Sequence, residues 1–249
     1  MVWEITALKD KTIIIFEQLM NRDELEKLIN SKDFNRKLIK AEFDKGTDLS
    51  NLDLHGIDFT DAIGDNINFA NSNLSNCDFT GTRFENVNFD SANLQGAILK
   101  NCDMRFANFH KADCRGTKFS CTIMEGSNHD GIIIDDKTEN YKMHCPETGA
   151  FLGYKKCFND LLVTLLIPAD ARRVCSTTRP CRCDKAKVIN ITSFDYKEHY
   201  TEAWSLCAST DFKYTLGEYV FPDSFNPDRW MESTHGIHFW LTPEEAMAY

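Results

Sequence analysis

A chain of 249 residues can hold one or two domains, and its formal net charge of −10 argues against a protein that coats nucleic acid over its whole surface. It contains no run of eighteen apolar residues, so no membrane-spanning segment is predicted. The first residues, MVWEITALKDK, carry charges where a signal peptide needs an apolar core, which predicts a cytoplasmic protein. The ten cysteines are accordingly expected to be reduced.

Residues 1–46 are predicted to form an N-terminal cap for the repeats that follow them. Two β-rich stretches, Val2–Ile5 and Thr12–Phe16, are separated by a turn-like segment and predict a hairpin. Asn21 and Glu24 then stand at the spacing of a capping box, ahead of leucines and an isoleucine on one face. A short helix is therefore expected to complete the cap.

From Thr47 to Gly126 the chain repeats a five-residue block that reads small, polar, Leu or Phe, polar, polar. The central position is apolar in every block except at Gly64. A period of five fits neither a helix face nor a strand face, so the chain must turn at each block. We expect a coil of four short sides with the central and the small residues pointing inward.

These blocks resemble the A(D/N)Lxx motif of pentapeptide-repeat proteins, and the resemblance implies a right-handed quadrilateral β-helix. The predicted fold is mainly β, with about four coils, an N-terminal hairpin and helix cap, and a C-terminal α+β domain. The β-helix is expected to occupy 47–136, including weak further blocks after Gly126. Stacked coils need caps at their ends because each coil buries its interior against its neighbours.

A second domain is predicted at 140–249, joined by the polar segment 136–140, because all six prolines lie beyond residue 145. Leu161–Ile167 is a continuous apolar run and predicts a buried strand. Two further strands are expected at Ala186–Ile191 and Tyr214–Phe221. Thr242 followed by Pro243 predicts the start of a short terminal helix.

A basic segment at 172–187 holds six cations and one acid in an otherwise acidic protein. Arginine forks and hydroxyl groups suit a phosphate-bearing ligand, so this segment predicts an anion-contacting set. Its members are Arg172, Arg173, Ser176, Thr177, Arg179, Arg182 and Lys185. A glycine-containing loop at 145–157 could add Lys155 and Lys156. A solvated basic loop paired with nearby carboxylates explains the same composition.

His235 and His238 flank Gly-Ile and could act as acid and base or as metal ligands. Positions three apart in a strand face opposite ways, so both reach one site only if Gly236 bends the chain. Cys181 and Cys183 form a C-x-C pair and not the C-x₂-C pair of a zinc knuckle. A mixed zinc site that combines this pair with Cys175, Cys207 and the two histidines is a weak alternative, and no metal or cofactor is predicted.

Four strings in this region, CPETGAFLGYKKC, IPADARR, RPCRCDKAKV and GIHFWLTPEEA, resemble a domain of uncharacterised function that follows pentapeptide repeats in bacteriophage and prophage proteins. The resemblance implies a phage or prophage origin, which would place the protein in the host cytoplasm, and it indicates no reaction.

Three functions remain open. The favoured one is a non-catalytic binding protein whose β-helix is a rigid scaffold and whose basic site takes a phosphorylated small molecule, a nucleotide or a host macromolecule. The second is a nucleotide-acting transferase, of the ADP-ribosyl or 2′-phosphotransferase kind, that uses His235 or His238.

The third function is a DNA mimic that acts on gyrase, like the gyrase-protecting pentapeptide proteins. The charge pattern disfavours it, because residues 47–96 carry a net −7 and residues 97–126 a net +2. Direct binding of duplex DNA is not expected. Uncovered strand edges could drive homo-oligomerisation.

Overall fold

The computed structural model describes residues 5–8, 11–14, 19–206 and 212–249. The chain divides into two compact units, 1–142 and 143–249. Among the described residues, no helix combines the length and the apolar character needed to cross a membrane.

The N-terminal cap consists of a hairpin and one helix. Strands β1 (Ile5–Leu8) and β2 (Lys11–Ile14) pair antiparallel, which confirms the predicted hairpin, although 2–4 and 15–16 of the predicted stretches lie outside the described residues. Helix α1 (Arg22–Ile29) begins at the predicted capping box. Asn21 Oδ1 accepts from the Glu24 backbone at 3.1 Å, and Glu24 Oε2 accepts from the Asn21 backbone at 3.0 Å.

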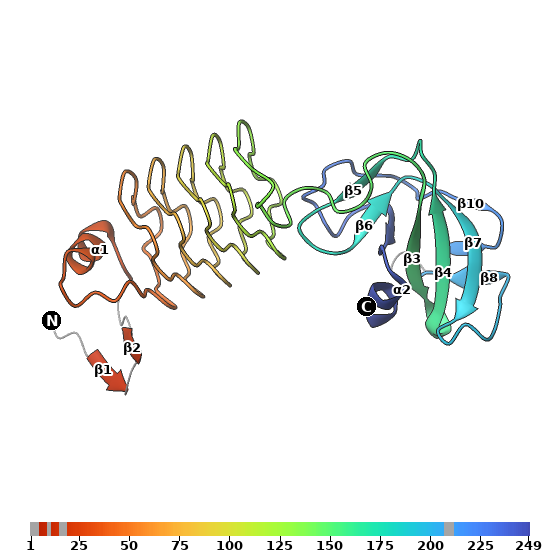
Figure 1. Ribbon diagram of the computed structural model, residues 1–249, viewed down its shortest axis with the longest axis horizontal. Coiled ribbons are helices and arrows are strands. Elements are labelled where there is room, and N and C mark those ends of the chain that lie inside the picture. The colour runs from red at the N-terminus through yellow and green to blue at the C-terminus, as the bar shows by residue number, and fades with distance from the viewer. Residues whose placement is uncertain (1–4, 9–10, 15–18, 207–211) are drawn as a thin grey trace. The chain divides into compact units, whose positions relative to one another are not determined.

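Residues 37–139 form a continuous parallel coil, seen as a stack of turns in Figure 1. Most of its bridges join residues twenty apart, such as Asn68 with Asn88, so each coil contains four five-residue sides. The bridges run from Lys37–Asp58 to Lys118–Glu139 and give about five coils, one more than predicted.

Both ends of the coil extend beyond the predicted limits. Leu38 and Phe43 are buried and fill two additional central positions before Leu49. One extra residue between Phe43 and Leu49 interrupts the period, which hid these two blocks in the sequence. At the other end Glu139 bridges to Lys118, so 136–140 belongs to the last coil and its interpretation as a linker was wrong.

Stacked rings and small polar side chains fill the interior of the coil. Phe59 stacks on Phe79 with centroids 4.9 Å apart, and Phe89 lies between Phe69 and Phe109 at 5.6 and 5.3 Å. Because successive coils superimpose every twenty residues, phenylalanines at this spacing meet face to face. This confirms that the central positions point inward, and each buried ring contributes about 1.5–3 kcal/mol.

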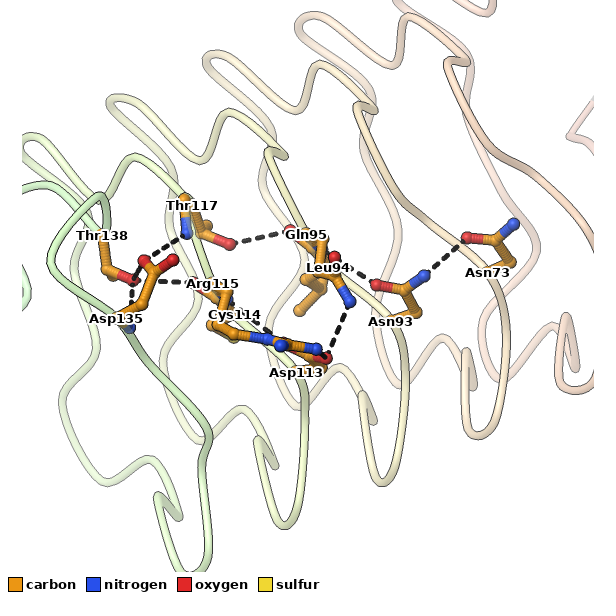
Figure 2. Close-up of polar contacts among 11 residues, drawn as sticks. Asn73, Asn93, Leu94, Gln95, Asp113, Cys114, Arg115, Thr117, Asp135 and Thr138 are labelled. Atoms are coloured by element: carbon orange, nitrogen blue, oxygen red, sulfur yellow. Dashed lines mark hydrogen bonds and ion pairs between the residues drawn. The ribbon is translucent and has the colours of Figure 1, made fainter.

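The small inward position carries a hydrogen bond between coils. In Figure 2 the Thr117 hydroxyl donates to the Leu94 carbonyl at 2.7 Å. Cys77 and Cys102 occupy the same position, and their thiols donate to the carbonyls of Leu54 and Phe79. Burial raises the pKa of both thiols to about 12, so they remain protonated and act as small inward residues.

Asparagine ladders run along the outside of the coil. Figure 2 shows Asn93 Nδ2 donating to Asn73 Oδ1 at 3.1 Å, one coil away. The polar residue before the central position therefore joins coils, in addition to the turn role expected from the sequence. The corners need a left-handed backbone, and Asn71 and Asn76, at φ of 58° and 57°, adopt it at modest cost.

The C-terminal unit contains a four-stranded antiparallel sheet in the order β10-β7-β4-β3 (Figure 1). Its strands are β3 (Phe151–Cys157), β4 (Leu161–Ile167), β7 (Ala186–Ser193) and β10 (Tyr219–Val220). A smaller sheet, β11-β6-β5, contains β5 (Arg173–Cys175), β6 (Cys181–Cys183) and β11 (Ile237–Phe239). Strands β8 (Glu202–Trp204) and β9 (Lys213–Thr215) form a pair, and the short helix α2 (Pro243–Ala248) starts at Thr242 as predicted.

Two predictions for this unit need correction. The expected strand Tyr214–Phe221 is two strands in different sheets, because a turn with Gly217 at a φ of 85° separates them. The glycine-containing loop at 145–157 is largely strand β3, where Gly153 makes room for the Phe239 ring. Among the described residues of this unit α2 is the only α-helix, so the domain is β-rich.

Candidate functional site

The basic segment forms β5, the following turn, β6 and the start of β7. Arg173 is buried within it, with 8% of its surface exposed. Its guanidinium donates to backbone carbonyls, those of Pro146, Gly149, Pro168, Ala169 and Ala171. Arg173 therefore joins the loop that precedes β3 to the loop that follows β4.

Arg182 is buried in the same way, with 3% of its surface exposed. It donates to the carbonyls of Asn226, Asp228 and His235 at 3.0, 2.7 and 3.2 Å. Burial lowers the pKa of this guanidinium, while Asp228 and Glu232 oppose the change. Arg182 thus fixes the irregular segment that precedes β11.

The cations of the predicted set that are exposed or half-buried each have a carboxylate partner. Arg172 Nε lies 2.8 Å from Asp184 Oδ2, and Lys185 Nζ lies 2.6 Å from Asp170 Oδ2. Arg179 pairs with Glu245 in the first turn of α2, and Lys156 Nζ lies 3.7 Å from Asp160 Oδ1. These contacts match the alternative in which the basic segment pairs with nearby carboxylates.

The two hydroxyl residues of the set, Ser176 and Thr177, are buried at 4% and 2% exposure. Ser176 donates to Glu232, and its oxygen lies 3.2 Å from the Thr178 hydroxyl. Ser176 and the guanidinium groups of the predicted set therefore contact separate protein groups.

A cavity of about 540 Å³ lies elsewhere in this unit, and we call it the histidine cavity. Its wall contains Lys155 from β3 together with His235 and His238, three residues of the predicted sites. Gly236 has a φ of 141°, which bends the chain so that both histidines border the same cavity. Polar residues Asp223, Ser224, Ser233 and Thr234 also line it.

His238 is held by backbone groups. Its Nε2 donates to the Glu232 carbonyl at 3.2 Å. Burial lowers the pKa of His238, and the positive charges of Lys155 and Arg182 lower it further. The imidazole is therefore neutral at pH 7 and presents a polar, uncharged edge.

A third cluster gathers side chains that the sequence did not connect. Cys175 and Cys181 pair across the β5–β6 hairpin, and the Cys145 sulfur lies 3.0 Å from the Cys175 sulfur. His144 Nε2 lies 3.4 Å from the Cys181 sulfur and 2.9 Å from the Arg179 carbonyl. Contacts with the Cys145 and Cys181 thiols lower the pKa of Cys175.

This cluster differs from the mixed metal site considered from the sequence. Of that set Cys175 and Cys181 take part; His235 and His238 border the histidine cavity, and Cys207 lies outside the described residues. The two cysteines that face each other have five residues between them, a spacing that indicates a metal pair only once the hairpin is known. His144 and Cys145, thirty residues earlier, had no local signal.

Two families match separate parts of the chain. Pentapeptide repeats (8 copies) match residues 53–90, 67–105 and 88–126, which confirms the repeat assignment and the right-handed β-helix that it implies. A family of unknown function (DUF5758) matches residues 141–246. No curated protein matches the chain.

Several solved structures of pentapeptide repeat proteins are similar to part of the chain. One from the cyanobacterium Cyanothece 51142 is 22% identical with a TM-score of 0.26, covering 46% of this chain and 98% of that one. One from the Arabidopsis thaliana thylakoid lumen is 29% identical with a TM-score of 0.24, covering 33% and 65%. One from Nostoc PCC 7120 is 21% identical with a TM-score of 0.27, covering 45% and 92%.

Proposed function

We propose that this chain, in which a right-handed pentapeptide-repeat β-helix precedes a domain of a family of unknown function, is a non-catalytic binding protein. The β-helix serves as a rigid scaffold, and the C-terminal domain takes a phosphorylated small molecule or a nucleotide in the histidine cavity. The observation that carries the proposal is the position of Lys155, which is 4% exposed and forms part of the cavity wall.

The size and lining of the histidine cavity suit such a ligand. About 540 Å³ falls in the range of about 300–1,000 Å³ of small-molecule sites. A lysine ammonium binds phosphate as a point charge, and the hydroxyls of Ser224, Ser233 and Thr234 add donors. Asp223 would repel a bare anion but can accept from a sugar hydroxyl or a base amino group, which favours a nucleotide over free phosphate.

The histidines support binding more than proton transfer. An acid–base pair needs two groups whose pKa values are driven apart around neutral pH. His238 has a lowered pKa and donates its Nε2 proton to a backbone carbonyl, so it is held as a neutral hydrogen-bonding group. We therefore assign His235 and His238 to ligand contact. A transferase is the alternative hypothesis, and an activity test would support it if the protein converts a nucleotide.

Neighbouring lysines of β3 supply the test. Lys155 lines the histidine cavity, whereas Lys156 pairs with Asp160 and is absent from the cavity lining. Thermal unfolding of the full chain is followed with ADP and with inorganic phosphate, because a ligand at 100 times its Kd stabilises the folded state by about 2.7 kcal/mol. ADP should raise the melting temperature of the wild type and of Lys156→Met, and have no effect on Lys155→Met.

An equal shift in Lys155→Met, or no shift with ADP or phosphate in the wild type, contradicts the cavity as an anion site. Conversion of a labelled nucleotide that is lost in His238→Gln would replace the binding function with a transferase. The phage or prophage setting and a host macromolecule as partner stay predictions.

A further inference from the structure

We propose that His144, Cys145, Cys175 and Cys181 bind one structural Zn²⁺ ion. These residues share no lining position with the histidine cavity, so this site and the proposed function stand or fall separately.

The hairpin places the first two ligands. Cys175 ends β5 and Cys181 begins β6, and the antiparallel register sets them directly opposite each other. Side chains of opposed residues project from the same face of a two-stranded pair, so both sulfurs reach one point. The ligand atoms of Cys175, Cys181 and His144 all lie within 4.8 Å of one another.

Cys145 adds a third sulfur from a different part of the chain. Its sulfur lies 3.0 Å from that of Cys175, and both residues are 2% exposed. A disulfide could use only two of the three cysteines and would leave the third thiol and His144 unexplained. Three thiolates and one imidazole are a common ligand set for structural zinc.

The Cys175 sulfur receives a hydrogen bond from the main chain of another ligand residue. It accepts the backbone N–H of Cys145 at 3.3 Å. A sulfur that accepts from a main-chain amide is suited to negative charge, which a metal ligand must carry.

The ligand chemistry favours zinc among the common metals. A tetrahedral site with three sulfurs and one nitrogen suits Zn²⁺, and closed four-coordinate sites are structural. His144 Nε2, which otherwise donates to the Arg179 carbonyl, exchanges that contact for the metal. The bound cluster carries a net charge of −1, and the buried guanidinium of Arg173 contacts the carbonyl of Pro146, next to Cys145.

Zinc at this position joins two elements of the same unit. His144 and Cys145 lie just before β3, and Cys175 and Cys181 lie in the β5–β6 hairpin. Because the ligands come from segments thirty residues apart, the metal closes a long loop and its binding energy adds to folding.

The test measures metal in the full chain, purified without chelator and reconstituted with Zn²⁺ under reducing, oxygen-free conditions. Elemental analysis should find about one zinc per chain, and X-ray absorption should find three sulfurs at about 2.3 Å and one nitrogen at about 2.0–2.1 Å. Cys175→Ala should lose the zinc. Cys157→Ala, which removes a sulfur of equal burial from the same unit, should keep it.

A second measurement uses the wild type alone, so it does not depend on whether Cys175→Ala folds. In the wild type, zinc should shield Cys145, Cys175 and Cys181 from alkylation, and a chelator should expose them together. The proposal is overturned if the reconstituted wild type holds no stoichiometric zinc, if Cys175→Ala retains it, or if Cys145 and Cys175 are recovered as a disulfide from reducing buffer.

Discussion

Asn88 lies one coil beyond Asn68, and its side-chain amide donates to the Asn68 side-chain oxygen at 2.9 Å. Asn108 donates to Asn88 at 2.9 Å, and Asn128 donates to Asn108 at 3.0 Å, so one hydrogen-bonded ladder crosses successive coils. The asparagine before the central position thus joins successive coils on the outside, whereas the phenylalanine rings join them on the inside.

We expect Asn88→Ala to destabilise the coil by about 1 kcal/mol more than Asn128→Ala. Asn88 has ladder neighbours on both sides, whereas among the described contacts Asn128 bonds along the ladder only to Asn108. Both residues also accept from the backbone two residues later, so this loss is common to the two variants. Urea unfolding followed by far-ultraviolet circular dichroism measures the difference; equal losses would mean that the ladder adds nothing.

Replacing Phe89 tests the interior. Phe89→Ala should cost about 3–5 kcal/mol, because its ring stacks between Phe69 and Phe109 and its removal leaves a cavity. Phe89→Leu should cost under about 1.5 kcal/mol, because leucine fills the same central position in other blocks. The same urea experiment compares them, and similar losses for the two variants would contradict packing as the cause.

Arg182→Met should destabilise the C-terminal unit by about 3 kcal/mol, because three partly buried carbonyls lose a charged donor. Arg179→Met should change stability by under about 1 kcal/mol, because its pair with Glu245 is exposed on the arginine side. Tryptophan fluorescence can follow the transition, since Trp204, Trp230 and Trp240 all lie in this unit. If Arg182→Met leaves the stability of the unit unchanged, Arg182 becomes a candidate for ligand binding again.

Stability should depend on pH through His238. Burial places its pKa in the folded protein below the ordinary value of 6.5, so the unfolded chain binds the proton more readily. Neutral His238 therefore contributes its full share to the free energy of unfolding above pH 6.5. This contribution is lost as the pH falls from 6.5 through the lowered pKa of the folded state.

The variant His238→Gln keeps a donor for the Glu232 carbonyl and cannot be protonated, so its stability should fall less between pH 7 and 5. His199→Gln, at an exposed histidine of the same unit, is the control and should keep the wild-type dependence. Fluorescence-monitored unfolding at a series of pH values provides the comparison. Identical slopes for wild type and His238→Gln would assign the pH dependence to other groups.

The coil was predictable because the residue pattern within each five-residue block is enough to indicate its turn and its inward side chains. Phe89 and Phe109 are apolar at a fixed interval, and a turn residue separates one block from the next, so a local pattern implies the tertiary contact. The pattern failed where its period changed, at the extra residue between Phe43 and Leu49 and again before Glu139, which bridges to Lys118 twenty-one residues earlier.

The C-terminal sites were less accessible to such reasoning. Arg182 looked like a ligand residue because its charge was visible in the sequence, whereas the three carbonyls that occupy it belong to a segment more than forty residues later. His235 and His238 share a cavity only through the backbone angle of Gly236.

From the order of its amino acids alone, this protein reveals its repeats, its inward-facing rings and the N-caps of α1 and α2, since these depend on neighbours a few residues away. The meeting of Cys145 with Cys175, and of Lys155 with the two histidines, required the folded chain. Such contacts join segments that are distant in the sequence. They depend on strand pairing and loop conformation, which a short stretch of sequence does not determine.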